Sequence, residues 1–182
     1  MSEITKMMIA KHNFFWNVTV VAPASIDVVV ELLLIIALVL FSLADLRYRV
    51  VPGIQVFFFG AVLLSVFSNP LGVAAIVLVV AWGSRSLYPH LIWPTLLNPV
   101  AWPVLLTGFG VRHGVIGKAD LLAIGGIACI FPWQAVVLSI LGVEVWRRWW
   151  VRHHNGPIPA LPGMLLGLML YLATKAFLLL GL

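Results

Sequence analysis

The sequence predicts an all-α membrane protein, a bundle of about six transmembrane helices with a Pro- and Trp-rich interfacial segment. Hydrophobic residues make up 63% of the 182 positions, and charged residues only 9%. The mean hydropathy is +1.12. A soluble domain carries about a quarter charged residues, so this chain cannot cover a water-facing surface. At about 20 residues per span, its length supplies six spans joined by short loops.

Six apolar segments account for the predicted spans. Charged clusters and Pro- or Gly-containing turns separate them. The spans are predicted at residues 26–44, 53–67, 71–83, 118–131, 133–146 and 161–180. We expect residues 26–182 to form one six-helix membrane domain and residues 1–25 to form an extracytoplasmic N-terminal segment. That segment has no apolar core of the length that a cleavable signal peptide needs.

Residues 89–113 are apolar but unusual, because four prolines interrupt them. A proline inside a helix removes a hydrogen-bond donor and clashes with the preceding turn. A straight spanning helix is therefore not expected here. Tryptophans lie between the prolines, and tryptophan favours the headgroup level of a bilayer. The pattern predicts an interfacial or re-entrant segment with these residues: Pro89, Trp93, Pro94, Pro99, Trp102 and Pro103.

The basic residues favour one orientation of the chain. If the chain crosses six times, eight of them fall on one side: Arg47, Arg49, Arg85, Arg112, Lys118, Arg147, Arg148 and Arg152. Lys6, Lys11 and Lys175 fall on the other side. The positive-inside rule assigns the side with eight to the cytoplasm and both termini to the outside of the plasma membrane. The net charge of +5 thus reflects contact with the lipid bilayer, and no nucleic-acid partner is expected.

Two acidic residues, Asp45 and Asp120, form the candidate catalytic pair. Asp45 follows the first span and Asp120 opens the fourth, so two crossings place both at the same membrane level. Ionisable residues at such positions are costly and suggest function. Two carboxyl groups at the edge of a low-dielectric bundle cannot both ionise easily. One can take a proton from water while the other donates to a scissile carbonyl, which is peptide hydrolysis without a covalent intermediate or a metal.

Each aspartate also has a structural interpretation. Asp120 can cap its helix or interact favourably with the helix dipole. Asp45 can pair with Arg47 or Arg49 at the headgroups. The sequence leaves these interpretations open beside the catalytic one.

The glycines before Asp120 have two interpretations as well. Gly114 and Gly117 can leave room for an extended substrate segment beside the aspartates. They can instead allow tight helix packing, which small residues commonly do in membranes.

No metal site and no cofactor are predicted. Cys129 is the single cysteine, which excludes a cysteine-based zinc site. His113 and the pair His153-His154 have no carboxylate or cysteine at ligand spacing. A basic patch at the lipid headgroups is the favoured interpretation of these histidines.

Three elements of the sequence resemble the prepilin and preflagellin peptidases. Residues 45–52, Asp-Leu-Arg-Tyr-Arg-Val-Val-Pro, resemble the Asp-x-x-x-x-x-[Ile/Val]-Pro element after the first catalytic helix of that family. Residues 114–122, Gly-Val-Ile-Gly-Lys-Ala-Asp-Leu-Leu, resemble the Gly-rich element with the second aspartate, especially its archaeal form, which ends in Gly-Gly-Ala-Asp. Residues 157–163 resemble the Pro-rich segment before the last helix. The elements follow the family order and anchor most of residues 26–182.

The resemblance implies a GxGD-type intramembrane aspartyl protease with Asp45 and Asp120 as its catalytic residues. Its implied substrates are type IV pilin-like and archaeal flagellin-like precursors, whose short leader peptides are cut on the cytoplasmic side after a glycine. Gly114, Gly117 and Lys118, which precede Asp120, are the candidate substrate-binding residues. The paired-cysteine methyltransferase region of the bacterial enzymes is absent from this sequence, so methylation is not expected.

The sequence departs from the family pattern around the second aspartate. The Gly-x-Gly-Asp motif reads Gly117-Lys118-Ala119-Asp120. The family's lysine two residues after the aspartate is Leu122, and Lys118 lies two residues before it instead. Lys118 therefore either assists catalysis or only meets lipid headgroups.

Two other functions are compatible with the sequence. A small transporter could use the aspartates to relay protons or bind a cation, but the middles of the spans are almost wholly apolar and no inverted repeat is visible. A catalytically degenerate assembly scaffold is compatible with the altered glycine motif.

Overall fold

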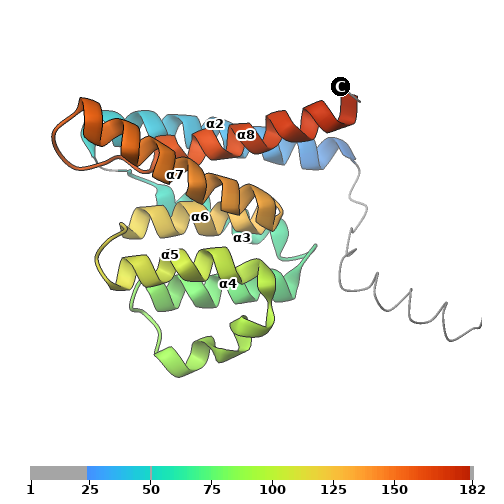
Figure 1. The fold of residues 1–182 in the computed structure, drawn as a ribbon. Coiled ribbons are helices and arrows are strands. Elements are labelled where there is room, and N and C mark those ends of the chain that lie inside the picture. The colour runs from blue at the N-terminus through green and yellow to red at the C-terminus, as the bar shows by residue number, and fades with distance from the viewer. Residues whose placement is uncertain (1–23, 50, 181–182) are drawn as a thin grey trace, which may run out of the picture.

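The computed structural model describes residues 24–49 and 51–180, and every regular element within these ranges is a helix. The predicted all-α class is confirmed for this part of the chain (Figure 1). Most of the predicted N-terminal segment 1–25, including Lys6 and Lys11, lies outside the described residues.

Six α-helices coincide with the six predicted spans. They are α2 (Ala24–Tyr48), α3 (Ile54–Ser65), α4 (Pro70–Gly83), α6 (Lys118–Ile130), α7 (Trp133–His153) and α8 (Leu161–Leu180). The start of α4 shows how the sequence sets a boundary. Pro70 occupies its first turn, and the Asn69 side chain accepts a hydrogen bond of 3.0 Å from the N–H of Gly72. Both are typical N-terminal signals.

Two helices run further than predicted, because their charged ends remain helical. Helix α2 continues through Asp45 to Tyr48, and α7 continues past Trp146 to His153. In α7 the carboxylate of Glu144 accepts hydrogen bonds from Arg147 at 2.7 Å and from Arg148 at 2.8 Å. Pairs at these spacings stabilise a helix surface, so the charged run extends α7 rather than ending it.

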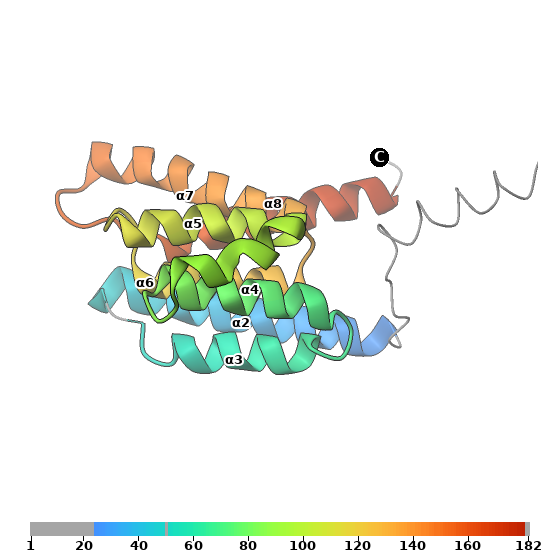
Figure 2. The ribbon, with the colours of Figure 1, turned by 90° about the horizontal axis from the view of Figure 1, so that it is seen from below.

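The Pro-rich segment contains a helix that the sequence interpretation missed. The 3₁₀-helices η1 (Pro89–Leu97) and η2 (Pro99–Ala101) are followed by the regular helix α5 (Trp102–Arg112). Pro103 lies in the first turn of α5, where its missing N–H costs nothing. Figure 2 shows η1 lying over α4 and α5. The guanidinium of Arg85 donates a 2.8 Å hydrogen bond to the carbonyl of Arg112. The two ends of the segment, just after α4 and at the end of α5, therefore lie side by side.

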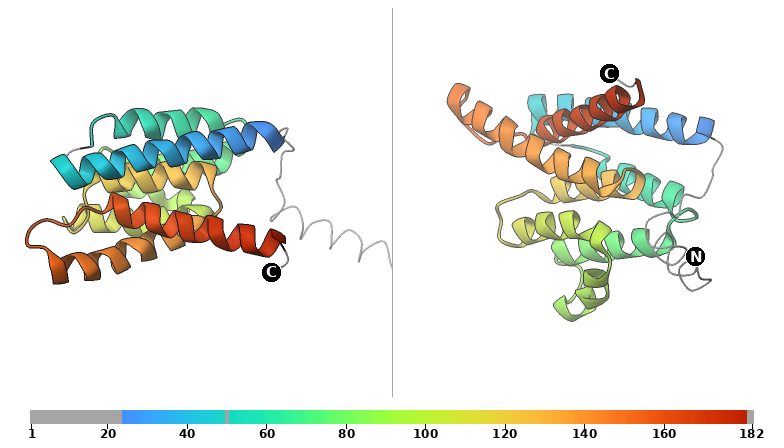
Figure 3. Two further views of the ribbon diagram at one scale, coloured as in Figure 1. Left: turned by 90° about the horizontal axis from the view of Figure 1, so that it is seen from above. Right: turned by 45° about the vertical axis from the view of Figure 1, so that its right-hand side comes forward.

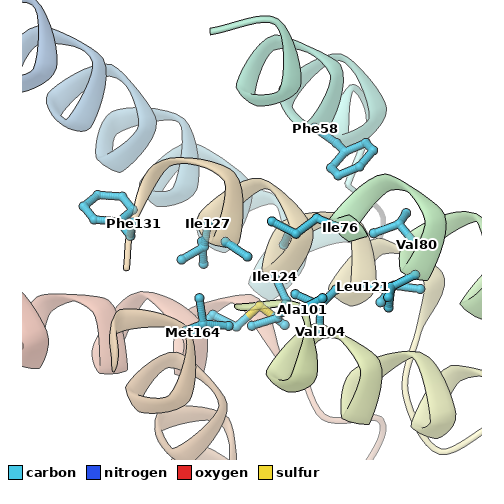
Figure 4. Packing of buried hydrophobic residues seen from close by; sticks show 14 of the residues in the cluster. Phe58, Ile76, Val80, Ala101, Val104, Leu121, Ile124, Ile127, Phe131 and Met164 are labelled. Carbon is cyan, nitrogen blue, oxygen red and sulfur yellow. The ribbon is translucent and has the colours of Figure 1, made fainter. Parts of the chain in front are cut away.

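Helix α6 lies at the centre of the bundle. It contacts α3, α4, α5, α7 and α8. Leu121, Ile124 and Ile127 on α6 are almost fully buried. Figure 4 shows these side chains packed with residues of neighbouring helices, among them Phe58 on α3 and Ile76 on α4. The first turn of α6, which carries Asp120, is therefore anchored by a rigid helix.

Helices α7 and α8 run antiparallel and pack closely through glycines (Figure 3). A Cβ atom added to Gly163 on α8 would lie 2.6 Å from the Cα of Val143 and 2.9 Å from the carbonyl oxygen of Gly142. Both of these atoms belong to the backbone of α7. Gly163 and Gly167 form a Gly-x-x-x-Gly pair, a spacing that lets helices approach closely in membranes.

The outer surface of the bundle is strongly apolar. Large side chains on the outside include Leu40 on α2, Val56 and Leu63 on α3, and Leu178 on α8, each at least 60% exposed. Within the described part, α2 and α8 are long and apolar enough to cross a membrane, whereas α3 and α4 are apolar but shorter. Exposed apolar surface of this extent marks contact with lipid or with another protein.

Candidate active site

The structure brings Asp45 and Asp120 together at one end of the bundle. Asp45 lies in the last turn of α2, and Asp120 lies in the first turn of α6. The carboxyl groups are close enough for their charges to interact. In Figure 1 this is the end at which α2, α5 and α7 finish and α6 and α8 begin. Two groups that are distant in the sequence thus share one site.

Backbone geometry holds the Asp120 carboxylate. Its Oδ2 atom accepts a 3.1 Å hydrogen bond from the N–H of Gly117, the residue just before α6. An acidic side chain that reaches back in this way satisfies one of the donors that a helix start leaves open. The structural interpretation of Asp120 as a cap is therefore correct, and it also fixes the direction of the carboxylate. Its Oδ1 atom has no hydrogen bond to the described residues.

A third helix holds Asp45. The N–H of Leu161, the first residue of α8, donates a 3.3 Å hydrogen bond to its Oδ2 atom. The N–H of Ala160 also interacts with this carboxylate. Prolines at 159 and 162 flank these two residues, and proline has no N–H to donate. The Pro-rich segment thus places the N–H of Leu161 at hydrogen-bond distance from Asp45 and the N–H of Ala160 beside it.

The sequence left open an ion pair of Asp45 with Arg47 or Arg49, but in the structure both arginines contact aromatic rings instead. Among the described residues, neither Arg47 nor Arg49 forms an ion pair with it at salt-bridge distance. The Arg47 guanidinium lies over the ring of Tyr48, and that of Arg49 lies over the ring of Trp150. Arg49 still interacts with Asp45 through its charge.

The two glycines before Asp120 do different things. Gly114 has φ of +73°, and an added Cβ would meet nothing within 4 Å. Its N–H bonds to the carbonyl of Val111, and the N–H of Val115 bonds to that of Gly110, which is the Schellman pattern at a helix C-terminus. At Gly117 an added Cβ would lie 3.1 Å from Oδ2 of Asp120. Neither glycine serves helix packing: one ends α5 and the other leaves space for the carboxylate.

We expect Gly114→Ala to lower the free energy of unfolding by about 1 kcal/mol, because the alanine must adopt a left-handed conformation. Thermal unfolding in detergent measures this loss. The matched control is Gly60→Ala on α3, where φ is ordinary and nothing lies within 4 Å of the added Cβ. Equal midpoints for the two variants would contradict the role of Gly114 as a helix terminator.

Lys118 is the first residue of α6, and its side chain is exposed. It has no ion pair in the described part of the chain. Residues two apart on a helix do not face each other, so Lys118 and Asp120 point to different sides of α6.

Lys118→Ala is therefore expected to reduce the proposed cleavage by less than about tenfold, a change of ~1.4 kcal/mol. Initial cleavage rates under saturating precursor measure the effect. A loss approaching that of the aspartate variants would show instead that the lysine stabilises charge at the site.

Two arginines near the site have roles that the sequence interpretation missed. Arg112 donates to the carbonyls of Trp82 at 2.9 Å and Leu87 at 3.1 Å, and it lies over the Trp82 ring. It thereby fastens the end of α5 to the end of α4. Arg49 contacts Trp150 on α7. From the sequence, Arg112 is interpreted only as a topology signal and Arg49 only as a topology signal or a partner of Asp45, because no local spacing reveals a contact with a distant aromatic ring.

Among the residues described, no three His, Cys, Asp or Glu side chains converge as a metal site would require. Comparison of the chain with protein-family models, with curated proteins and with solved structures gives no match. The geometry of the site and the sequence elements that surround it are therefore the basis for assigning a function.

Proposed function

We propose that this chain is a membrane aspartyl endopeptidase that removes leader peptides from type IV pilin-like or archaeal flagellin-like precursors. The observation that carries the proposal is the meeting of Asp45 and Asp120, on different helices, at one end of an apolar bundle. The three sequence elements that resemble the peptidase family all lie at this end. Two of them supply the aspartates, and the third supplies the N–H of Leu161, which donates to Asp45.

The proposed chemistry follows from what each group can do. One carboxylate takes a proton from water, and the water attacks the scissile carbonyl. The other carboxyl group donates a proton to the substrate. Hydrogen bonds from Leu161 and Gly117 hold one oxygen of each carboxyl group, which leaves the other oxygens for water and substrate. Gly117 has no side chain of its own, so the Asp120 carboxylate lies against the backbone there, and this is where the proposed extended substrate segment would approach.

The proposed membrane arrangement uses α2, α3, α4, α6, α7 and α8 as six spans, with the aspartates facing the cytoplasm. Arg49, Arg85 and Arg112 lie at the same end of the bundle as the aspartates. Lys175 pairs with Glu31 at 3.7 Å near the other end. This distribution of charge is what the positive-inside rule requires.

Labelling of single cysteines in sealed vesicles tests this orientation. Cysteines are placed at positions 147 and 175 in a Cys129→Ala background, which removes the native thiol. A membrane-impermeant maleimide is expected to react with position 175 from the outside and with position 147 only from the cytoplasmic side. Labelling of position 147 from the outside would overturn the orientation.

The proposed activity is tested by incubating the purified protein in detergent with pilin-like and flagellin-like precursors. We expect one cut after a glycine, detected as loss of the leader by mass spectrometry. A folded protein that cleaves none of these precursors would contradict the proposal and favour the assembly-scaffold alternative.

A further inference from the structure

Arg49 adopts a backbone conformation that arginine rarely adopts. It follows the last residue of α2 with φ of +57°, in the left-handed region. Helices often end on such a residue, and glycine usually occupies the position because other side chains are strained there. A strained backbone that persists in a structure must be held by its surroundings, so the contacts of the Arg49 side chain are the next question.

The Arg49 side chain spans the gap between two helices. Its guanidinium lies 4.8 Å from the centre of the Trp150 ring on α7. Trp150 is only 7% exposed, although Trp149 and Val151 on either side of it are exposed. The ring of His154 stacks on Trp150 at 4.0 Å with an interplanar angle of 12°. Trp150 is therefore a well-held platform for the guanidinium, in a contact that is favourable between a cation and an aromatic face.

Arg49 is also a near neighbour of the catalytic candidate Asp45. Arg49 and Asp45 interact through their charges, and the N–H of Arg49 bonds to the carbonyl of Asp45 at 3.2 Å. The other groups around this carboxylate are Asp120 on α6 and the N–H groups at the start of α8. Arg49 thus carries its positive charge at the end of the helix that bears Asp45, with the guanidinium held over the Trp150 ring.

We propose that Arg49, seated on Trp150, is a positioning residue that holds the carboxyl group of Asp45 in register with that of Asp120. The inference rests on the proposed function. Paired carboxyl groups work only in a narrow range of geometry, and a displacement of about 1 Å can cost a hundredfold in rate. Helix α7 carries neither of the two catalytic aspartates. Through the contact of Trp150 with Arg49, it helps to fix the position of Asp45.

The decisive variant is Arg49→Gly, because glycine relieves the backbone strain while removing the side chain. We expect kcat to fall at least about tenfold with KM within about twofold, and we expect no fall in the thermal midpoint. The matched control is Arg85→Gly, since Arg85 also has a left-handed backbone, with φ of +67°. Its guanidinium bonds to Arg112, and its removal is expected to leave kcat within about twofold.

Two variants of the platform test the contact itself. Trp150→Phe keeps an aromatic face and is expected to retain at least about half of kcat. Trp150→Leu removes the face and is expected to match Arg49→Gly. If Arg49→Gly cleaves at the wild-type rate, or loses kcat only together with a lowered thermal midpoint, the positioning role is overturned while the proposed function stands.

A readout without catalysis separates the two proposals. A water-soluble carbodiimide with a small amine modifies carboxyl groups, and peptide mass spectrometry follows the rate of modification at Asp45. We expect Arg49→Gly to speed modification of Asp45 at least about threefold, because the carboxyl group loses its neighbouring cation, and we expect Arg85→Gly to leave the rate unchanged. An unchanged rate in Arg49→Gly overturns the inference, whether or not the wild-type protein cleaves any precursor.

Discussion

Replacing either Asp45 or Asp120 by asparagine is expected to abolish leader removal while the bundle stays folded. Asparagine keeps the size of the side chain, and its amide oxygen can still accept the hydrogen bonds from Leu161 and Gly117. It cannot titrate, so it neither takes a proton from water nor donates one to the substrate. We expect kcat to fall at least about a thousandfold. Cleavage of a precursor by purified protein measures the loss, and thermal unfolding checks the fold.

Two further variants complete this test: the double variant with asparagine at both Asp45 and Asp120, and a substitution of a distant carboxylate. Because the two aspartates act as one unit, the double variant should be little slower than either single one. Glu31→Gln is the control, since Glu31 lies on the same helix as Asp45 and pairs with Lys175 near the other end of the bundle. Its cleavage rate is expected to stay within about twofold. Full activity in Asp120→Asn would refute the peptidase proposal and leave the scaffold and transporter alternatives.

Gly167→Ala is expected to produce the largest loss of stability among single substitutions of glycine by alanine. The added Cβ would collide with the carbonyl oxygen of Leu138 and lie 2.6 Å from the Cα of Ser139. These are backbone atoms of α7, so the clash is relieved only by separating α7 from α8. We expect the free energy of unfolding to fall by about 3 kcal/mol, measured by thermal or denaturant unfolding in detergent.

The same substitution should also reduce cleavage, because the first turn of α8 holds Asp45 through Leu161. Gly60→Ala again serves as the control, since its added Cβ meets nothing within 4 Å. A variant at position 167 with the stability of this control would contradict the close packing of α7 on α8.

The positions of the helices could be predicted closely from the sequence. Predicted spans at 71–83 and 161–180 correspond to Pro70–Gly83 and Leu161–Leu180. Proline and asparagine mark the first of these starts through local chemistry, because Pro70 fits a first helical turn and Asn69 caps it. Such signals act between residues that are neighbours along the chain, so they can be identified without knowledge of the fold.

Helix α5 shows what this local reasoning left out. Four prolines argued against a straight spanning helix over residues 89–113, and two 3₁₀-helices do interrupt this segment, but the regular helix Trp102–Arg112 was not predicted. Pro103 begins that helix rather than breaking it. The distinction depends on where the helix starts, and its start is stabilised by burial of Val104 and Ala101 against the core. Packing of this kind is not encoded in proline spacing.

The sequence alone was enough to identify the apolar composition and six of the helical segments, and to predict that Asp45 and Asp120 lie at one end of the bundle. What holds the two carboxyl groups depends on the tertiary structure. Asp45 bonds to Leu161, 116 residues further along the chain, and Arg49 meets Trp150 on α7. These contacts depend on how the helices pack in space, because side chains that are distant in the sequence meet only after buried faces and close glycine contacts have fixed the bundle.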